Sequence, residues 1–166
     1  MRRLLIVGFG DIAQRMVPLL AGRCRIYALA RGPRRFVLLR ALGVTPIPGD
    51  LDEPASLAPL AGLAHDVAHL APPPDRGARD TRTAHLVAAL AKGGSLPQHF
   101  VYISTSGVYG DCRGERVPET RPLRQQTGRA RRRADAERFG LPHPPRVTRA
   151  EAERVIPENL RSFIYE

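Results

Sequence analysis

Three small residues near the N-terminus, Gly8, Gly10 and Ala13, have a spacing that could serve ligand binding. They form a G-x-G-x-x-A pattern that directly follows an apolar run and opens an amphipathic segment. In such a pattern the first glycine permits a tight turn, the second lets a ligand approach the backbone, and the small third residue keeps helix and strand close. Because a helix N-terminus attracts anions, the pattern predicts a site for the pyrophosphate of a dinucleotide such as NAD(P).

A turn of this kind can also use glycine for geometry alone. Further evidence for cofactor binding therefore has to come from the residues after the second apolar run. That run ends at Ala30 and is followed by Arg31, with Arg34 and Arg35 close by. No acidic residue stands where a ribose 2'-hydroxyl would be bound, and an arginine there suits the 2'-phosphate of NADP. We therefore predict NADP as the cofactor, with NAD as the alternative. An exposed basic loop is the other interpretation of these arginines.

These residues need a parallel sheet to bring them together. Short apolar runs predict strands near residues 3–8, 25–30, 43–48, 66–71 and 99–104, and apolar residues at helical spacing predict helices near 11–21, 33–42, 54–62 and 78–93. The alternation predicts an α/β fold, a Rossmann-like doubly wound parallel sheet of five strands in the order 3-2-1-4-5. A charged helix is expected over 128–138. We assign residues 1–139 to an NAD(P)-binding domain and 140–166 to an irregular C-terminal tail.

A further motif follows the last predicted strand, where Phe100 to Gly110 reads FVYISTSGVYG. Together with the Gly8 turn, Gly49-Asp50-Leu51 and the run 71–74, this stretch resembles the extended and atypical short-chain dehydrogenase/reductases, the NAD-dependent epimerase/dehydratase family. The resemblance covers about residues 1–138. It implies oxidoreductase or epimerase chemistry on a small molecule, and a nucleotide sugar is one such substrate.

The resemblance also implies a role for each residue at the strand ends. The cofactor-binding residues would be Gly8, Gly10, Asp11, Ile12, Ala13, Arg31, Asp50, Leu51, Leu70 and Ala71. Asp50 and Leu51 would lie beside the adenine, and Leu70 and Ala71 beside the ribose and nicotinamide. Thr105, with its neighbour Ser106, stands where the family has its catalytic serine or threonine. The alternative is a turn whose hydroxyls satisfy local backbone groups.

Two departures from the family pattern bear on catalysis. The family's tyrosine and its lysine four residues later are replaced by Thr127 and Arg131, which we assign to the catalytic positions. A threonine is a far poorer proton donor than an activated phenol, so we predict weakened catalysis. The other departure is length, because residues 140–166 resemble a fragment of the family's C-terminal region without the part that precedes it. The alternatives are a reductase whose acid is Thr105, water or Tyr109, and a non-catalytic cofactor-sensing or interaction module.

The net charge of +10 comes almost entirely from arginine, since Lys92 is the only lysine. The arginines are spread along the chain, and the run 129–133 lacks interleaved aromatic residues. Nucleic-acid binding is therefore the weaker alternative. Cys24 and Cys112 are isolated, which favours a reduced, cytoplasmic setting.

The sequence also bears on membrane insertion, metal binding and assembly. No apolar run approaches the roughly 20 residues that a membrane-spanning helix needs. His65 and His69 have helical spacing but fall in a predicted strand, so no metal site is expected. Apolar residues in the tail, such as Leu141, Phe163 and Ile164, would favour disorder or a homo-oligomer.

Overall fold

The computed structural model of the chain describes residues 1–92, 96–118 and 120–138. Five strands form one sheet: β1 (Arg2–Val7), β2 (Cys24–Ala30), β3 (Thr45–Pro48), β4 (Asp66–His69) and β5 (His99–Tyr102). Their order is β3-β2-β1-β4-β5, and every neighbouring pair is parallel. The predicted fold and strand order are confirmed. The tail assigned to 140–166 lies outside the described residues.

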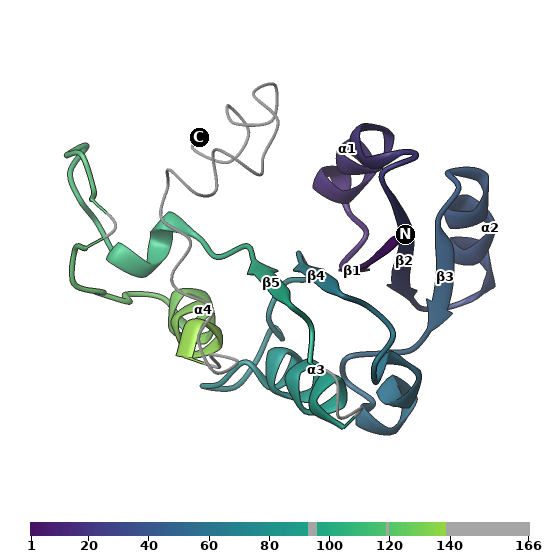
Figure 1. The fold of residues 1–166 in the computed structure, drawn as a ribbon. Coiled ribbons are helices and arrows are strands. Elements are labelled where there is room, and N and C mark those ends of the chain that lie inside the picture. Colours follow the sequence, from purple (N-terminus) through teal and green to yellow (C-terminus); the bar gives the residue numbers. More distant parts are fainter. Residues whose placement is uncertain (93–95, 119, 139–166) are drawn as a thin grey trace.

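The helices lie on both faces of this sheet (Figure 1). They are α1 (Asp11–Leu20), α2 (Pro33–Ala41), α3 (Thr81–Ala91) and α4 (Gly128–Arg138), with two 3-10 helices, η1 (Pro54–Leu60) and η2 (Ser106–Tyr109). The α-helix predicted near 54–62 is therefore a 3-10 helix instead. Pro59 lies inside it and lacks the N–H that an α-helical hydrogen bond requires.

Alternate residues of the central strands point to opposite faces of the sheet and pack into two apolar layers. Leu5 and Val7 pack with η1 and α3 on one face, whereas Ile6 packs with α1 and α2 on the other. All three side chains are fully buried. Burial of each of these side chains stabilises the fold by roughly 1.5 to 3 kcal/mol. The helices on both faces of the sheet are therefore packed against β1.

The strand order reverses at β1, which pairs with β2 on one side and β4 on the other. In open parallel sheets the loops diverge at such a point, and ligands bind beyond the carboxyl ends of the strands there. The turn from β1 into α1 contacts the chain after β4 at this edge (Figure 1). None of the described helices combines the length and apolar character needed to cross a membrane.

Candidate functional site

Gly8 ends β1 in a backbone conformation that favours glycine, with φ of +99°. A Cβ atom at this position would lie 2.4 Å from the backbone N of Ala71 and 2.6 Å from its Cα. Close by, the N–H of Leu70 donates to the carbonyl of Val7 at 2.7 Å. The turn after β1 and the chain after β4 are thus in direct backbone contact, which only a residue without a side chain allows.

Gly10 precedes α1 and has the opposite surroundings. Its φ is −91°, and a Cβ atom there would meet nothing within 4 Å. The first helical hydrogen bond runs from the Gln14 N–H to the Gly10 carbonyl at 3.1 Å, so the N–H groups of Asp11, Ile12 and Ala13 precede the helical ladder. An open, unobstructed helix N-terminus of this kind suits an anion.

The first residues of α1 are compatible with an anion at the helix N-terminus. Ala13 is fully buried in the layer between α1 and the sheet, as the small third residue of the pattern requires. The carboxylate of Asp11 lies in the first turn of the helix, where it accepts a hydrogen bond from Arg15 Nε at 2.8 Å. This exposed pair reduces the repulsion that Asp11 alone would exert on a phosphate.

Arg31 and Asp50 face each other at the ends of β2 and β3. Arg31 Nη1 lies 3.3 Å from Asp50 Oδ2, and the Arg31 side chain is 70% exposed. The other oxygen of Asp50 accepts from the Asp52 N–H at 3.0 Å, so the carboxylate is held in place. Most of the guanidinium donors of Arg31 therefore remain open to solvent or to a ligand.

Arg82 joins the loops after β3 and β4. Its Nε and Nη2 donate to the two carboxylate oxygens of Asp52 at 2.8 and 2.6 Å, and its Nη1 lies 3.4 Å from the carbonyls of Pro72 and Pro73. The hydrogen bond from Arg82 holds the pKa of Asp52 below its usual range. Leu51 and Ala71, which flank these loops, are buried, whereas Leu70 is only partly buried.

The hydroxyls after β5 are engaged locally. Thr105 Oγ1 accepts a hydrogen bond from the Gly107 N–H at 3.3 Å at the start of η2, whose first residue is Ser106. Ser104 Oγ donates to Glu137 Oε1 on α4 in a very short hydrogen bond. Thr105 thus keeps its own O–H available for a ligand while its oxygen serves the backbone.

Thr127 and Arg131 make only local hydrogen bonds among the described residues. Thr127 Oγ1 accepts from the Ala130 N–H at 3.1 Å and so caps α4, while the exposed Arg131 side chain faces Ala78. The guanidinium at the strand ends belongs instead to Arg133, which the sequence argument did not single out.

Arg133 is buried although it is charged. Its Nη1 donates to the carbonyl of Ile103 at 2.7 Å and to the hydroxyl of Tyr102 at 3.0 Å, and its carbon Cζ lies 5.3 Å from the centroid of the Tyr102 ring. The same nitrogen lies 3.4 Å from the Ala71 carbonyl. The burial of Arg133 could have been predicted from helical spacing, because residues 130, 133, 134 and 137 share one face of a helix.

A buried polar network lies beneath the strand ends. His69 Nε2 is 2.9 Å from Thr83 Oγ1, which donates to Asp80 Oδ2 at 2.9 Å. Burial lowers the pKa of His69 to about 4; the charge of Asp80 opposes this shift and that of Arg133 adds to it. His69 is therefore neutral at pH 7.

This histidine predicts acid sensitivity of the fold. Between about pH 6.5 and 4 the unfolded chain binds a proton at His69 and the folded chain does not, so stability falls as the pH falls. The decrease attributable to this group is at most about 3.4 kcal/mol. Urea unfolding at several pH values in this range measures it, and His69→Gln should flatten the slope. An unchanged slope in that variant contradicts the assignment.

Comparison with known proteins gives matches at the level of structure. No family model and no curated protein matches the sequence. A functionally unknown conserved protein from Silicibacter pomeroyi aligns with a TM-score of 0.64 at 28% identity, over 83% of this chain and 47% of that one. The UDP-glucose 4-epimerase from Thermus thermophilus, solved with NAD, aligns with a TM-score of 0.65 at 25% identity, over 82% and 49%.

A short-chain dehydrogenase/reductase superfamily protein from Agrobacterium tumefaciens, solved with bound NAD, shares the fold at 20% identity. Its TM-score is 0.62, over 82% of this chain and 43% of that one. The chain spans about half or less of the length of each of these solved proteins. The family resemblance in the sequence is thus matched by the structure, and this chain has the Rossmann fold of the NAD-dependent epimerases and short-chain dehydrogenase/reductases.

Proposed function

We propose that this chain binds a nicotinamide dinucleotide at the carboxyl ends of β1, β2 and β4, and that it prefers NADP(H) to NAD(H). The observation that carries the proposal is the contrast between the two glycines of the turn. Gly8 has no room for a side chain because the backbone of Ala71 touches it, whereas Gly10 faces open space at the N-terminus of α1. Packing explains the first glycine, and approach of a ligand to the backbone explains the second.

The positions around the turn fit the remaining parts of the cofactor. The pyrophosphate would accept from N–H groups at the start of α1, and Asp50 and Leu51 would lie beside the adenine. Leu70 and Ala71 would border the ribose and nicotinamide. The bound cofactor would supply or accept a hydride.

Catalysis by this chain would be weak. A threonine that caps α4 stands where the related enzymes have a proton-donating tyrosine, and Arg131 points toward Ala78. Thr105, with Ser106 beside it, is the remaining hydroxyl at the end of β5 that could polarise a substrate. A nucleotide sugar is the substrate class that the epimerase relatives suggest. A protein that binds the cofactor without turnover is the second candidate, and the cap formed by Thr127 favours it.

Cofactor choice is the direct test. Arg31 can form charge-assisted hydrogen bonds to the 2'-phosphate, so NADP(H) should bind about tenfold to a hundredfold more tightly than NAD(H). Arg31→Asp should remove or reverse the preference. Asp50→Asn should raise it about twofold to fivefold, because it removes a carboxylate that competes for Arg31. Calorimetric titration of both cofactors into each variant measures these changes.

Arg40→Asp is the matched control, since it makes the same charge change at an exposed position in the last turn of α2. It should leave the preference nearly unchanged. Equal affinities for the two cofactors in the unaltered protein contradict the NADP assignment. Failure of both cofactors to bind at millimolar concentration contradicts the proposed function itself.

A further inference from the structure

A cavity of about 200 Å³ lies between α4 and the loop that precedes α3. Its walls are formed by Ala78, Gln125, Arg131, Ala134, Asp135 and Arg138. Pockets that enclose a drug-sized ligand usually measure about 300 to 1,000 Å³. This cavity is therefore too small for a dinucleotide, but it has room for an oxyanion and part of the molecule that carries it.

Two features fix the wall of this cavity. Arg132, on the buried side of α4, donates from Nη1 to the carbonyl of Gly77 at 2.8 Å. Asp135 Oδ2 accepts from the N–H of Asp80 at 2.9 Å. Both bonds hold the backbone on either side of Ala78 against α4, so the cavity is framed by hydrogen bonds rather than by a loose loop.

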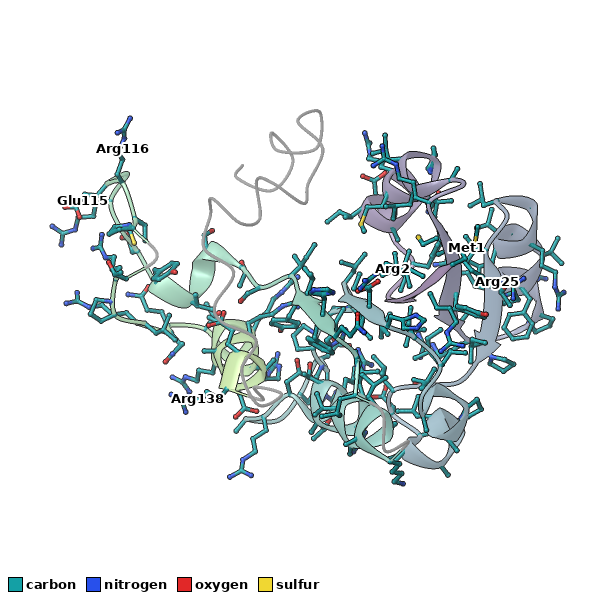
Figure 2. All side chains as sticks on the ribbon, in the orientation of Figure 1. Met1, Arg2, Arg25, Glu115, Arg116 and Arg138 are labelled. Atoms are coloured by element: carbon teal, nitrogen blue, oxygen red, sulfur yellow. The ribbon has the colours of Figure 1, made fainter. Side chains whose placement is uncertain are left out.

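Arg131 and Arg138 line the cavity and are not engaged in the way that four other arginines of this region are. Arg82 and Arg121 are paired with carboxylates, and Arg132 and Arg133 donate to carbonyls. Within the described part of the chain, the guanidinium groups of Arg131 and Arg138 have neither a hydrogen bond nor an ion pair. Figure 2 shows Arg138 at the far end of α4.

The spacing of these two residues suits convergence on one ligand. They are two helical turns apart, about 10 Å along the axis, with Asp135 between them. Long arginine side chains can span that separation from both ends. The lining carries two positive charges and one negative charge, and the carboxylate is already engaged by the Asp80 N–H. The Gln125 amide adds a further donor.

We propose that this cavity is an anion site for a phosphate group, either free or as the monoester of a small molecule. The site is separate from the dinucleotide site and goes beyond the proposed function. Guanidinium groups recognise phosphate through paired, charge-assisted hydrogen bonds, and the two unengaged groups here supply the donors.

Titration of the protein with inorganic phosphate, and separately with methyl phosphate, tests the proposal by calorimetry at low ionic strength. Saturable binding is expected, and Arg131→Gln or Arg138→Gln should each weaken it by about tenfold. Arg129→Gln is the matched control, because it removes the same charge from an exposed position of α4 outside the cavity. It should change the affinity less than about twofold. Tighter binding of methyl phosphate would identify a monoester as the ligand, and weaker binding of methyl phosphate would identify free phosphate.

Gly10→Ala separates this site from the cofactor turn. Phosphate binding should persist in that variant, and NADP(H) affinity should persist in Arg138→Gln. Absence of saturable phosphate binding overturns the proposal, as does equal weakening by Arg129→Gln. Loss of phosphate binding in Gly10→Ala also overturns it, since the anion would then lie at α1. Failure of NADP(H) to bind leaves the phosphate result standing.

Discussion

Gly8→Ala should prevent stable folding of this domain, whereas Gly10→Ala should fold and lose dinucleotide affinity. At Gly8 the added methyl group would lie 2.4 to 2.8 Å from backbone atoms of Leu70 and Ala71, which cannot rotate away as a side chain can. The φ of +99° adds roughly 1 to 2 kcal/mol of strain for a residue with a Cβ atom. Steric displacement of β4 from β1 would add more. A typical domain is stable by only about 5 to 15 kcal/mol, so loss of the pairing between β1 and β4 would be enough to unfold it.

Gly10→Ala is the matched variant, since the same methyl group there meets no atom within 4 Å. A less favourable helix N-cap should cost only about 1 kcal/mol of stability. Affinity for NADP(H) should fall at least about tenfold, because the methyl group occupies the approach to the helix N-terminus. Urea unfolding and cofactor titration of both variants measure the contrast. Equal loss of stability in the two variants contradicts this account of the turn.

Asp80→Ala should be the most damaging loss of a polar side chain in the buried network. The side chain of Asp80 is almost fully buried. Its carboxylate caps α3 by accepting a hydrogen bond from the Thr83 N–H at 3.0 Å, and it accepts a second one from the Thr83 hydroxyl at 2.9 Å. Loss of the cap, which is the hydrogen bond from the Thr83 N–H, costs about 1 kcal/mol, and the buried Thr83 hydroxyl left without its acceptor costs about 1 to 3 kcal/mol. We expect the free energy of unfolding to decrease by about 3 kcal/mol.

Chemical denaturation of two other variants completes that test. Asp80→Asn keeps an acceptor for the Thr83 N–H and should recover part of the stability. Asp75→Ala removes an exposed carboxylate from the same loop and should change stability by less than about 0.5 kcal/mol. If Asp80→Ala is no worse than Asp75→Ala, the buried network does not stabilise α3.

The sheet could be predicted because its signals are local and repeated. Apolar runs alternate with helical patterns, and such alternation leaves few topologies other than a parallel sheet with crossover helices. The glycine turn between the first strand and the first helix could also be predicted from local spacing, but the contact of Gly8 with Ala71, which follows β4, could not. The 3-10 form of η1 was missed because the apolar spacing masked the effect of Pro59 inside the segment.

The positions of the α4 side chains were harder to predict. Thr127 and Arg131 were assigned by position in a family pattern, but the surroundings of a helical residue depend on how the helix docks. Here α4 turns Arg133 toward the sheet and Arg131 toward Ala78. A run of arginines suggests a solvated face, so a buried guanidinium was not expected. It is tolerated because the carbonyls of Ala71 and Ile103, beyond the ends of their strands, lie within its reach.

The contact between Gly8 and Ala71 also constrains the order in which the domain assembles. The two residues are far apart in the sequence, so the turn after β1 cannot take its final shape until β4 has paired with β1. A nascent chain that has emerged only as far as β3 would already contain the whole glycine pattern and still have no formed turn. Ligand affinity should therefore appear late in synthesis, together with the closing of the sheet.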